Sequence, residues 1–103
     1  MEEKLCSPDI VLESVDITEF GDLPQGLYVY KIQCNISGTV VEHLVQVYAK
    51  YETNSVLLNW KPVEGVDEYR VYRGRDINCS DGFFVIYDQS YFHDNGLGEL
   101  NIM

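Results

Sequence analysis

The sequence is poor in basic residues, and that shortage excludes one large class of partner. Only 7 Lys and Arg stand against 17 Asp and Glu, so the formal net charge is −10. A surface with so little positive charge repels a phosphate backbone, and we expect no nucleic-acid partner. Solubility explains the acidity, and attraction to a basic partner is the alternative.

Membrane and secretion signals are also missing. No stretch approaches the roughly 18 consecutive apolar residues of a membrane span, so we expect no membrane association. The segment from Met1 to Leu5 is acidic, and no apolar segment long enough for a secretory signal follows it. The sequence therefore predicts a soluble protein made in a cytoplasm.

Cysteines are few, and their spacing fits neither a metal site nor a disulfide framework. Cys6, Cys34 and Cys79 form an odd number without CxxC spacing, so we expect reduced thiols. Cys34 falls within an alternating apolar pattern and is predicted to be a small buried hydrophobe.

Catalytic constellations are absent as well. The sequence has two histidines, and His93 precedes Asp94 directly, so on a strand their side chains point to opposite faces. No nucleophile elbow, phosphate loop or zinc-protease motif occurs. We expect no enzyme activity, no metal and no cofactor. The loop carboxylates Asp76, Asp81, Asp88 and Asp94 are predicted to form a solvated acidic rim, with a calcium site as the alternative.

The strongest pattern that is present is apolar alternation with a period of two. Residues 27–36 alternate as a half-buried strand, a turn follows at 35–38, and residues 39–51 form its hairpin partner. Further strands are predicted at 10–20, with a kink or bulge, and at 56–60, 68–73, 83–87 and 90–93. A polar break at 52–55 separates two of these strands.

Seven short strands without a helix predict an all-β protein, an antiparallel β-sandwich of one domain over residues 1–103. Its first part, residues 10–51, holds one strand and the hairpin, and residues 54–97 hold the other strands. The predicted core consists of inward-facing residues on four of the strands: Tyr30, Ile32, Cys34, Val56, Leu58, Trp60, Tyr69 and Val71.

Four residues are predicted to form an interaction surface. If Tyr69 faces the core, then Arg70 and Tyr72 face outward, and Tyr87 and Tyr91 are expected nearby. Tyrosine and arginine anchor protein interfaces, and aromatic rings also stack on sugars. Cross-strand pairing within the sheet is the alternative interpretation.

Residues 54–97 carry a recognisable pattern of motifs. It runs through Val56-x-Leu58-x-Trp60-x-Pro62, Gly65, Tyr69-Arg70-Val71-Tyr72-Arg73-Gly74, Phe84-x-Ile86 and Phe92-x-Asp94. This pattern resembles the B, C, C′ and E strands of a fibronectin type III or immunoglobulin-like domain. The form seen here is similar to domains of bacteriophage tail and decoration proteins and of bacterial extracellular proteins.

The strand order departs from that family. Residues 23–35 resemble its F strand, with Tyr30 at the position of the corner tyrosine, and residues 39–51 resemble its G strand. In the family this hairpin comes last, whereas here it comes first. Three arrangements are open: a circular permutation within one chain, a hairpin exchanged with a neighbouring subunit, and a separate small sheet formed by the first 50 residues.

The resemblance implies a non-enzymatic structural or assembly protein. We expect a phage virion component, assembled in the host cytoplasm as a capsid decoration, head-completion or tail protein. Its expected partners are other protein subunits, and a homo-oligomer is one form that this contact can take. The alternative is a carbohydrate-binding or adhesion module of a secreted or cell-surface protein, with a surface glycan as partner.

Overall fold

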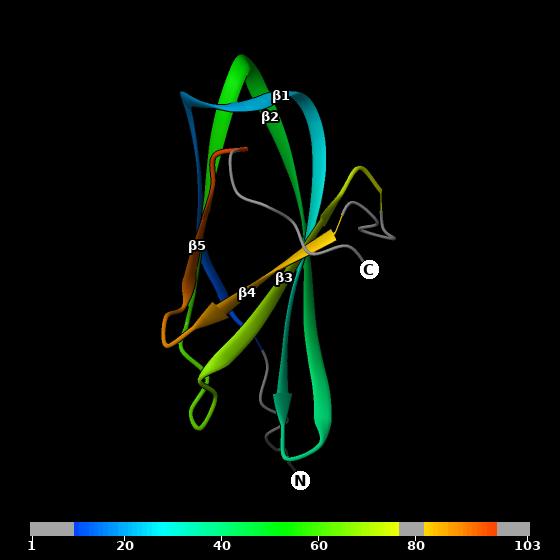
Figure 1. The fold of residues 1–103 in the computed structure, drawn as a ribbon, viewed down its shortest axis with the longest axis vertical. Coiled ribbons are helices and arrows are strands. Elements are labelled where there is room, and N and C mark those ends of the chain that lie inside the picture. Colours follow the sequence, from blue (N-terminus) through cyan, green and yellow to red (C-terminus); the bar gives the residue numbers. More distant parts are fainter. Residues whose placement is uncertain (1–9, 77–81, 97–103) are drawn as a thin grey trace, which may run out of the picture.

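The computed structural model describes residues 10–76 and 82–96, and every regular element in them is a β-strand. One antiparallel sheet has the order β4-β3-β1-β2-β5 (Figure 1). In this part of the chain no helix is long and apolar enough to cross a membrane. The five strands are β1 (Leu12–Ile36), β2 (Thr39–Trp60), β3 (Glu68–Gly74), β4 (Gly82–Tyr87) and β5 (Tyr91–Asp94).

The predicted hairpin is confirmed as the connection between β1 and β2. Ser37 and Gly38 have φ angles of 51° and 85°, and both values belong to a two-residue type I′ turn. The side chain of Asn35 accepts a hydrogen bond from the amide of Gly38 at 2.9 Å. This turn makes Ile36 and Thr39 the closing pair, and the register continues from there to Gly26 opposite Ala49.

The prediction of seven short strands is wrong, because β1 and β2 each run through two of them. The polar segment 52–55 does not end a strand, since Thr53 and Asn54 still pair with β1. Asn54 is fully buried, and its amide group donates to the carbonyl oxygens of Leu23 (3.2 Å) and Tyr51 (2.8 Å). The side chain of Asn54 therefore forms hydrogen bonds to backbone groups at a bend in the strands.

Gly21 lies on the other side of this bend. A Cβ atom at Gly21 would stand 2.3 Å from the carbonyl oxygen of Asn54, and the φ angle of 149° also favours glycine. The two strands can thus approach closely enough for the sheet to fold over.

The bends fold the sheet so that two halves face each other (Figure 1). We call one the four-stranded half (β4, β3, residues 26–36 and residues 39–49). The other is the three-stranded half (residues 12–18, residues 55–60 and β5). Trp60 packs edge-on against Tyr69 with ring centroids 5.2 Å apart, and Phe84 lies 4.5 Å from Phe92. The core between the halves contains all eight residues predicted for it, each at most 5% exposed.

The front hairpin is part of this same sheet. β1 pairs with β3 of its own chain, from Val29 opposite Gly74 to Gln33 opposite Arg70. The interpretation in which the first 50 residues form a separate sheet is therefore wrong.

Asp94 connects the two halves from inside the core. It is 2% exposed, and its Oδ2 accepts a hydrogen bond of 2.7 Å from the hydroxyl group of Tyr30. Nη1 of Arg73 donates to both carboxylate oxygens at 2.9 and 3.0 Å, and the amide of Gly96 donates to Oδ1 at 3.2 Å. The expectation that Asp94 lies on a solvated rim is wrong, because an ion pair replaces the water that its charge requires.

Removing this carboxylate should strongly destabilise the fold. We expect Asp94→Ala to lower the free energy of unfolding by about 3–5 kcal/mol, because the largely buried charge of Arg73 is left without its counter-ion. Urea unfolding followed by tryptophan fluorescence measures the difference. Asp16→Ala, which removes an exposed carboxylate, should change stability by no more than about 0.5 kcal/mol. Equal effects of the two substitutions would show that the ion pair has no special role.

A second prediction concerns alkaline pH. Burial, together with the negative charge of Asp94, raises the pKa of Tyr30 above its usual range. Above about pH 10 the unfolded chain releases this proton while the folded chain keeps it, so stability falls as the pH rises. In urea titrations between pH 9 and 11 (a range set around the tyrosine pKa of about 10), Tyr30→Phe should lose stability less steeply than the unchanged protein. Parallel pH profiles would contradict the assignment.

Candidate interaction surface

The outer face of the four-stranded half is built by alternation along its strands. Because inward and outward residues alternate, the register brings the outward residues of neighbouring strands into rows. One row across β4, β3, β1 and β2 consists of Phe83, Tyr72, Lys31 and Leu44. The next row consists of Val85, Arg70, Gln33 and Glu42.

The middle of this face is occupied by contacts within the sheet. The ring of Tyr72 lies 5.3 Å from that of Phe83, and Nζ of Lys31 lies 4.6 Å from the centroid of Tyr72. The hydroxyl group of Tyr72 donates to Gln33 at 3.2 Å, and Lys31 also pairs with Glu42 at 3.5 Å. Cross-strand pairing is thus the observed environment of Tyr72, which is only half-buried.

Of the four residues predicted for the surface, three share this face. Arg70 is exposed, with its guanidinium 5.0 Å from the ring of Phe83, and Tyr87 at the end of β4 is 63% exposed. Tyr91 lies elsewhere, because β5 pairs with β2 in the three-stranded half and directs Phe92 inward. The expectation that Tyr91 lies beside Tyr72 and Tyr87 is therefore wrong.

The structure also reveals an exposed apolar row that the sequence prediction missed. Val40, Leu44 and Tyr48 on β2 are 55%, 45% and 57% exposed, and we call them the β2 stripe. Leu27 of β1 is 41% exposed and pairs with Tyr48. The signal was present in the sequence, because residues 39–51 carry apolar side chains on both faces of the strand. Only the position of the core decides which face is exposed.

The backbone beside the stripe has no strand partner among the described residues. β5 pairs with β2 only from Val56 to Asn59, so residues 39–49 have β1 on one side alone. In an antiparallel hairpin closed by a hydrogen-bonded pair, every second residue directs its N–H and C=O groups away from its partner strand. Those residues are Val40, Glu42, Leu44, Gln46 and Tyr48. We call this row of backbone groups the free edge of β2.

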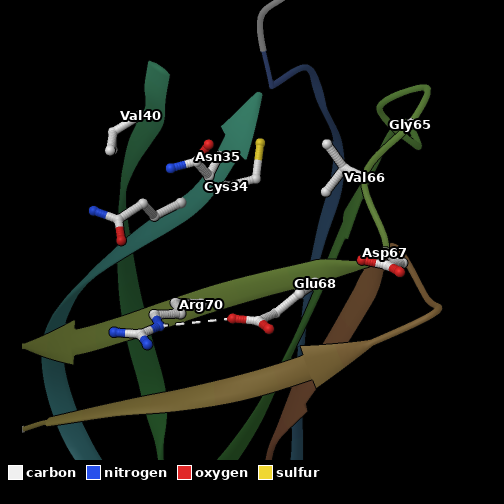
Figure 2. Close-up of a pocket in the computed structure, with 9 residues that line it drawn as sticks. Cys34, Asn35, Val40, Gly65, Val66, Asp67, Glu68 and Arg70 are labelled. Carbon is white, nitrogen blue, oxygen red and sulfur yellow. Dashed lines mark ion pairs between the residues drawn. The ribbon is translucent and has the colours of Figure 1, made fainter. Parts of the chain in front are cut away.

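A hollow of about 370 Å³ lies at one end of this half (Figure 2). Cys34 at the end of β1 lies across it from Val66, Asn35 points towards Val40, and the ion pair between Glu68 and Arg70 lines its wall. Burial raises the pKa of Cys34, which keeps the thiol protonated and unreactive at neutral pH.

Among the described residues no group of three or more His, Cys, Asp or Glu side chains could hold a metal ion. Asp81, one of the acidic residues considered for calcium, lies outside the described residues.

Comparison with known proteins identifies no relative of this chain. No protein-family model, no curated protein and no solved structure matches it. The function is therefore proposed from the surface and from the sequence motifs.

The two tyrosines of this face should respond differently to substitution. Tyr72→Ala removes ring packing, a cation contact and a hydrogen bond, so we expect a loss of about 1–3 kcal/mol. Tyr87→Ala, at a largely exposed ring, should change stability by no more than about 0.5 kcal/mol. Thermal unfolding of both variants tests this, and a larger loss for Tyr87→Ala would contradict the described packing.

Proposed function

We propose that this chain is a non-enzymatic structural or assembly protein that acts through contacts with other protein subunits. One observation carries the proposal. Of the eight large hydrophobic residues exposed in the described part of the chain, five lie on the outer face of the four-stranded half. Monomeric proteins seldom gather exposed apolar side chains on one face, and such patches mark interaction sites. These five residues are Leu27, Val40, Leu44, Tyr48 and Tyr87.

We assign the fold as a fibronectin type III-like β-sandwich with a permuted strand order. The two facing halves support this assignment, because β3, β4 and the front hairpin would correspond to the C, C′, F and G strands. Residues 55–60 and β5 would correspond to the B and E strands. The hairpin precedes the B-like strand in the sequence, yet in space it lies beside β3, which would be the C strand.

We place the protein in a virion, as a capsid decoration, head-completion or tail component. The support for this location is the similarity of the motifs in residues 54–97 to domains of phage virion proteins. An exposed apolar face fits that role, since a subunit of a particle must bind its neighbours without a ligand or cofactor.

The carbohydrate-binding alternative has weaker geometric support. A sugar platform requires aromatic rings side by side, and Tyr91 lies on the other half. Tyr87 is opposite Glu68, four positions along β3 from Tyr72, and the ring of Tyr72 is already packed against Phe83.

Incorporation into particles tests the proposed function. Mass spectrometry of gradient-purified particles from cells that produce the chain should detect it in constant ratio to the major capsid protein. Tyr87→Lys, which places a charge on the proposed face, should reduce incorporation at least tenfold, the effect of losing about 1.4 kcal/mol of binding energy. Tyr91→Lys, on the opposite half, is the matched control and should incorporate normally.

Two results would contradict this proposal. The chain could stay with the soluble fraction when particles are purified, or Tyr87→Lys could incorporate as well as Tyr91→Lys. Micromolar binding on a glycan array that Tyr87→Ala abolishes would instead support the carbohydrate-binding module.

A further inference from the structure

We infer that two copies of this chain pair antiparallel along the free edge of β2, with a twofold axis at Leu44. The inference rests on the proposed assembly function and specifies its partner as a second copy. The pairing joins the two four-stranded halves into one continuous sheet across the axis.

The order of side chains along the free edge is symmetrical in polarity. From Val40 to Tyr48 the outward residues are apolar, polar, apolar, polar and apolar. With the axis at Leu44, Val40 lies opposite Tyr48 of the partner subunit, and Glu42 lies opposite Gln46 of the partner subunit. Apolar residues then meet apolar residues, and every N–H and C=O group of the free edge obtains a partner.

Other registers match less well. An axis at Val45 places Leu44 opposite Gln46 of the partner subunit, and an axis at Glu42 places two like-charged carboxylates opposite each other. An axis at Gln46 leaves Val40 without an opposite residue on the free edge. The register at Leu44 is therefore the one that uses the whole edge without a polar mismatch among the outward side chains.

Charge favours a second copy over a basic partner at this place. Between Leu27 and Lys50 the chain has two lysines and one acidic residue, Glu42, so its acidic excess lies outside the front hairpin. Glu42 is moreover paired with Lys31 at 3.5 Å. Two such hairpins can meet without the repulsion that the net charge of −10 causes elsewhere.

The free edge also lacks the features that usually prevent strand pairing. Proline, lysine and irregularities of register are absent from residues 39–49. By contrast, residues 12–18, which among the described residues pair with β2 alone, carry Glu13 and Asp16, and β4 is six residues long. Long apolar edges without such protection add strands from another chain.

The inward face of β2 is compatible with this register. Val41 and Val45 pack against the core but are only half-buried, because no strand of the described chain lies beside the free edge of β2 to cover them. In the paired state Val41 lies opposite Val47 of the partner subunit, and Val45 lies opposite His43 of the partner subunit. Pairing thus covers apolar surface on both faces of the sheet.

Sedimentation velocity of the full chain over a range of concentrations tests the pairing. We expect a monomer–dimer equilibrium, and Gln46→Pro should raise its dissociation constant at least tenfold. Proline at this position removes an N–H group of the free edge and leaves the ladder to β1 intact. Val85→Pro is the matched control, because by the same alternation it removes an N–H group that points away from β3, the strand paired with β4. It should leave the dissociation constant unchanged, and melting curves show whether both variants fold.

Cysteine substitutions test the register and do not depend on a proline variant. In a chain with Cys6, Cys34 and Cys79 replaced by alanine, Leu44→Cys should form disulfide-linked dimers under mild oxidation, since it faces itself across the axis. Val40→Cys and Tyr48→Cys should cross-link when mixed, but not when each is oxidised alone.

The inference is overturned if the chain is monomeric at every concentration, if Val85→Pro but not Gln46→Pro weakens the dimer, or if Val40→Cys alone cross-links as readily as Leu44→Cys. None of these results touches the proposed function, because incorporation into particles is measured separately through Tyr87 on β4.

Discussion

The buried carboxylate of Asp94 is the constraint on which the rest of the fold depends. A charge with 2% exposure is tolerated only where hydrogen bonds and an opposite charge replace its water, and here Tyr30, Arg73 and Gly96 supply them. These groups come from β1, from β3 and from the segment after β5. The two halves of the sheet must therefore close on one another, and the hydroxyl group of Tyr30 must point into the core.

Closure of the halves in turn requires the bends of β1 and β2. The buried side chain of Asn54 bonds the backbone at Leu23 and Tyr51, and Gly21 leaves space for the close approach. Each long strand thus contributes to both halves. The cost of this arrangement is that the first part of β2 has β1 on one side and no strand on the other in the described chain. The free edge and the β2 stripe are consequences of how the sheet folds over.

The surface proposed for assembly combines exposed apolar side chains with backbone groups at a strand edge. In most sheets these two kinds of group lie in different places. On the free edge of β2, Val40, Leu44 and Tyr48 expose apolar side chains on the outer face, and their backbone groups at the rim have no strand partner among the described residues. Arg70 and Tyr87 extend this face towards β4, whereas the ring of Tyr72 stabilises the sheet between them. A partner strand can satisfy both kinds of group at once, which a small ligand cannot do.

The sequence by itself determined the strand alternation, a hairpin with its turn within residues 35–38, and the identity of the core around Trp60. These features depend on local patterns, namely a period of two, a turn that needs positive φ, and large apolar side chains that must be buried. The sequence also placed Arg70 on the outside of β3 correctly, because Tyr69 next to it faces inward.

Only the tertiary structure decided that the polar segment 52–55 is a bend within one strand and that Asp94 is buried. It also decided that Tyr91 lies on the other half and that the β2 stripe is exposed. Each of these depends on which strands pair across long distances in the sequence. A local sequence pattern does not show whether the hydrogen bonds of a polar side chain are made to water or to the opposite half of the sheet. Likewise, an alternating strand that is apolar on both faces does not show which face meets the core.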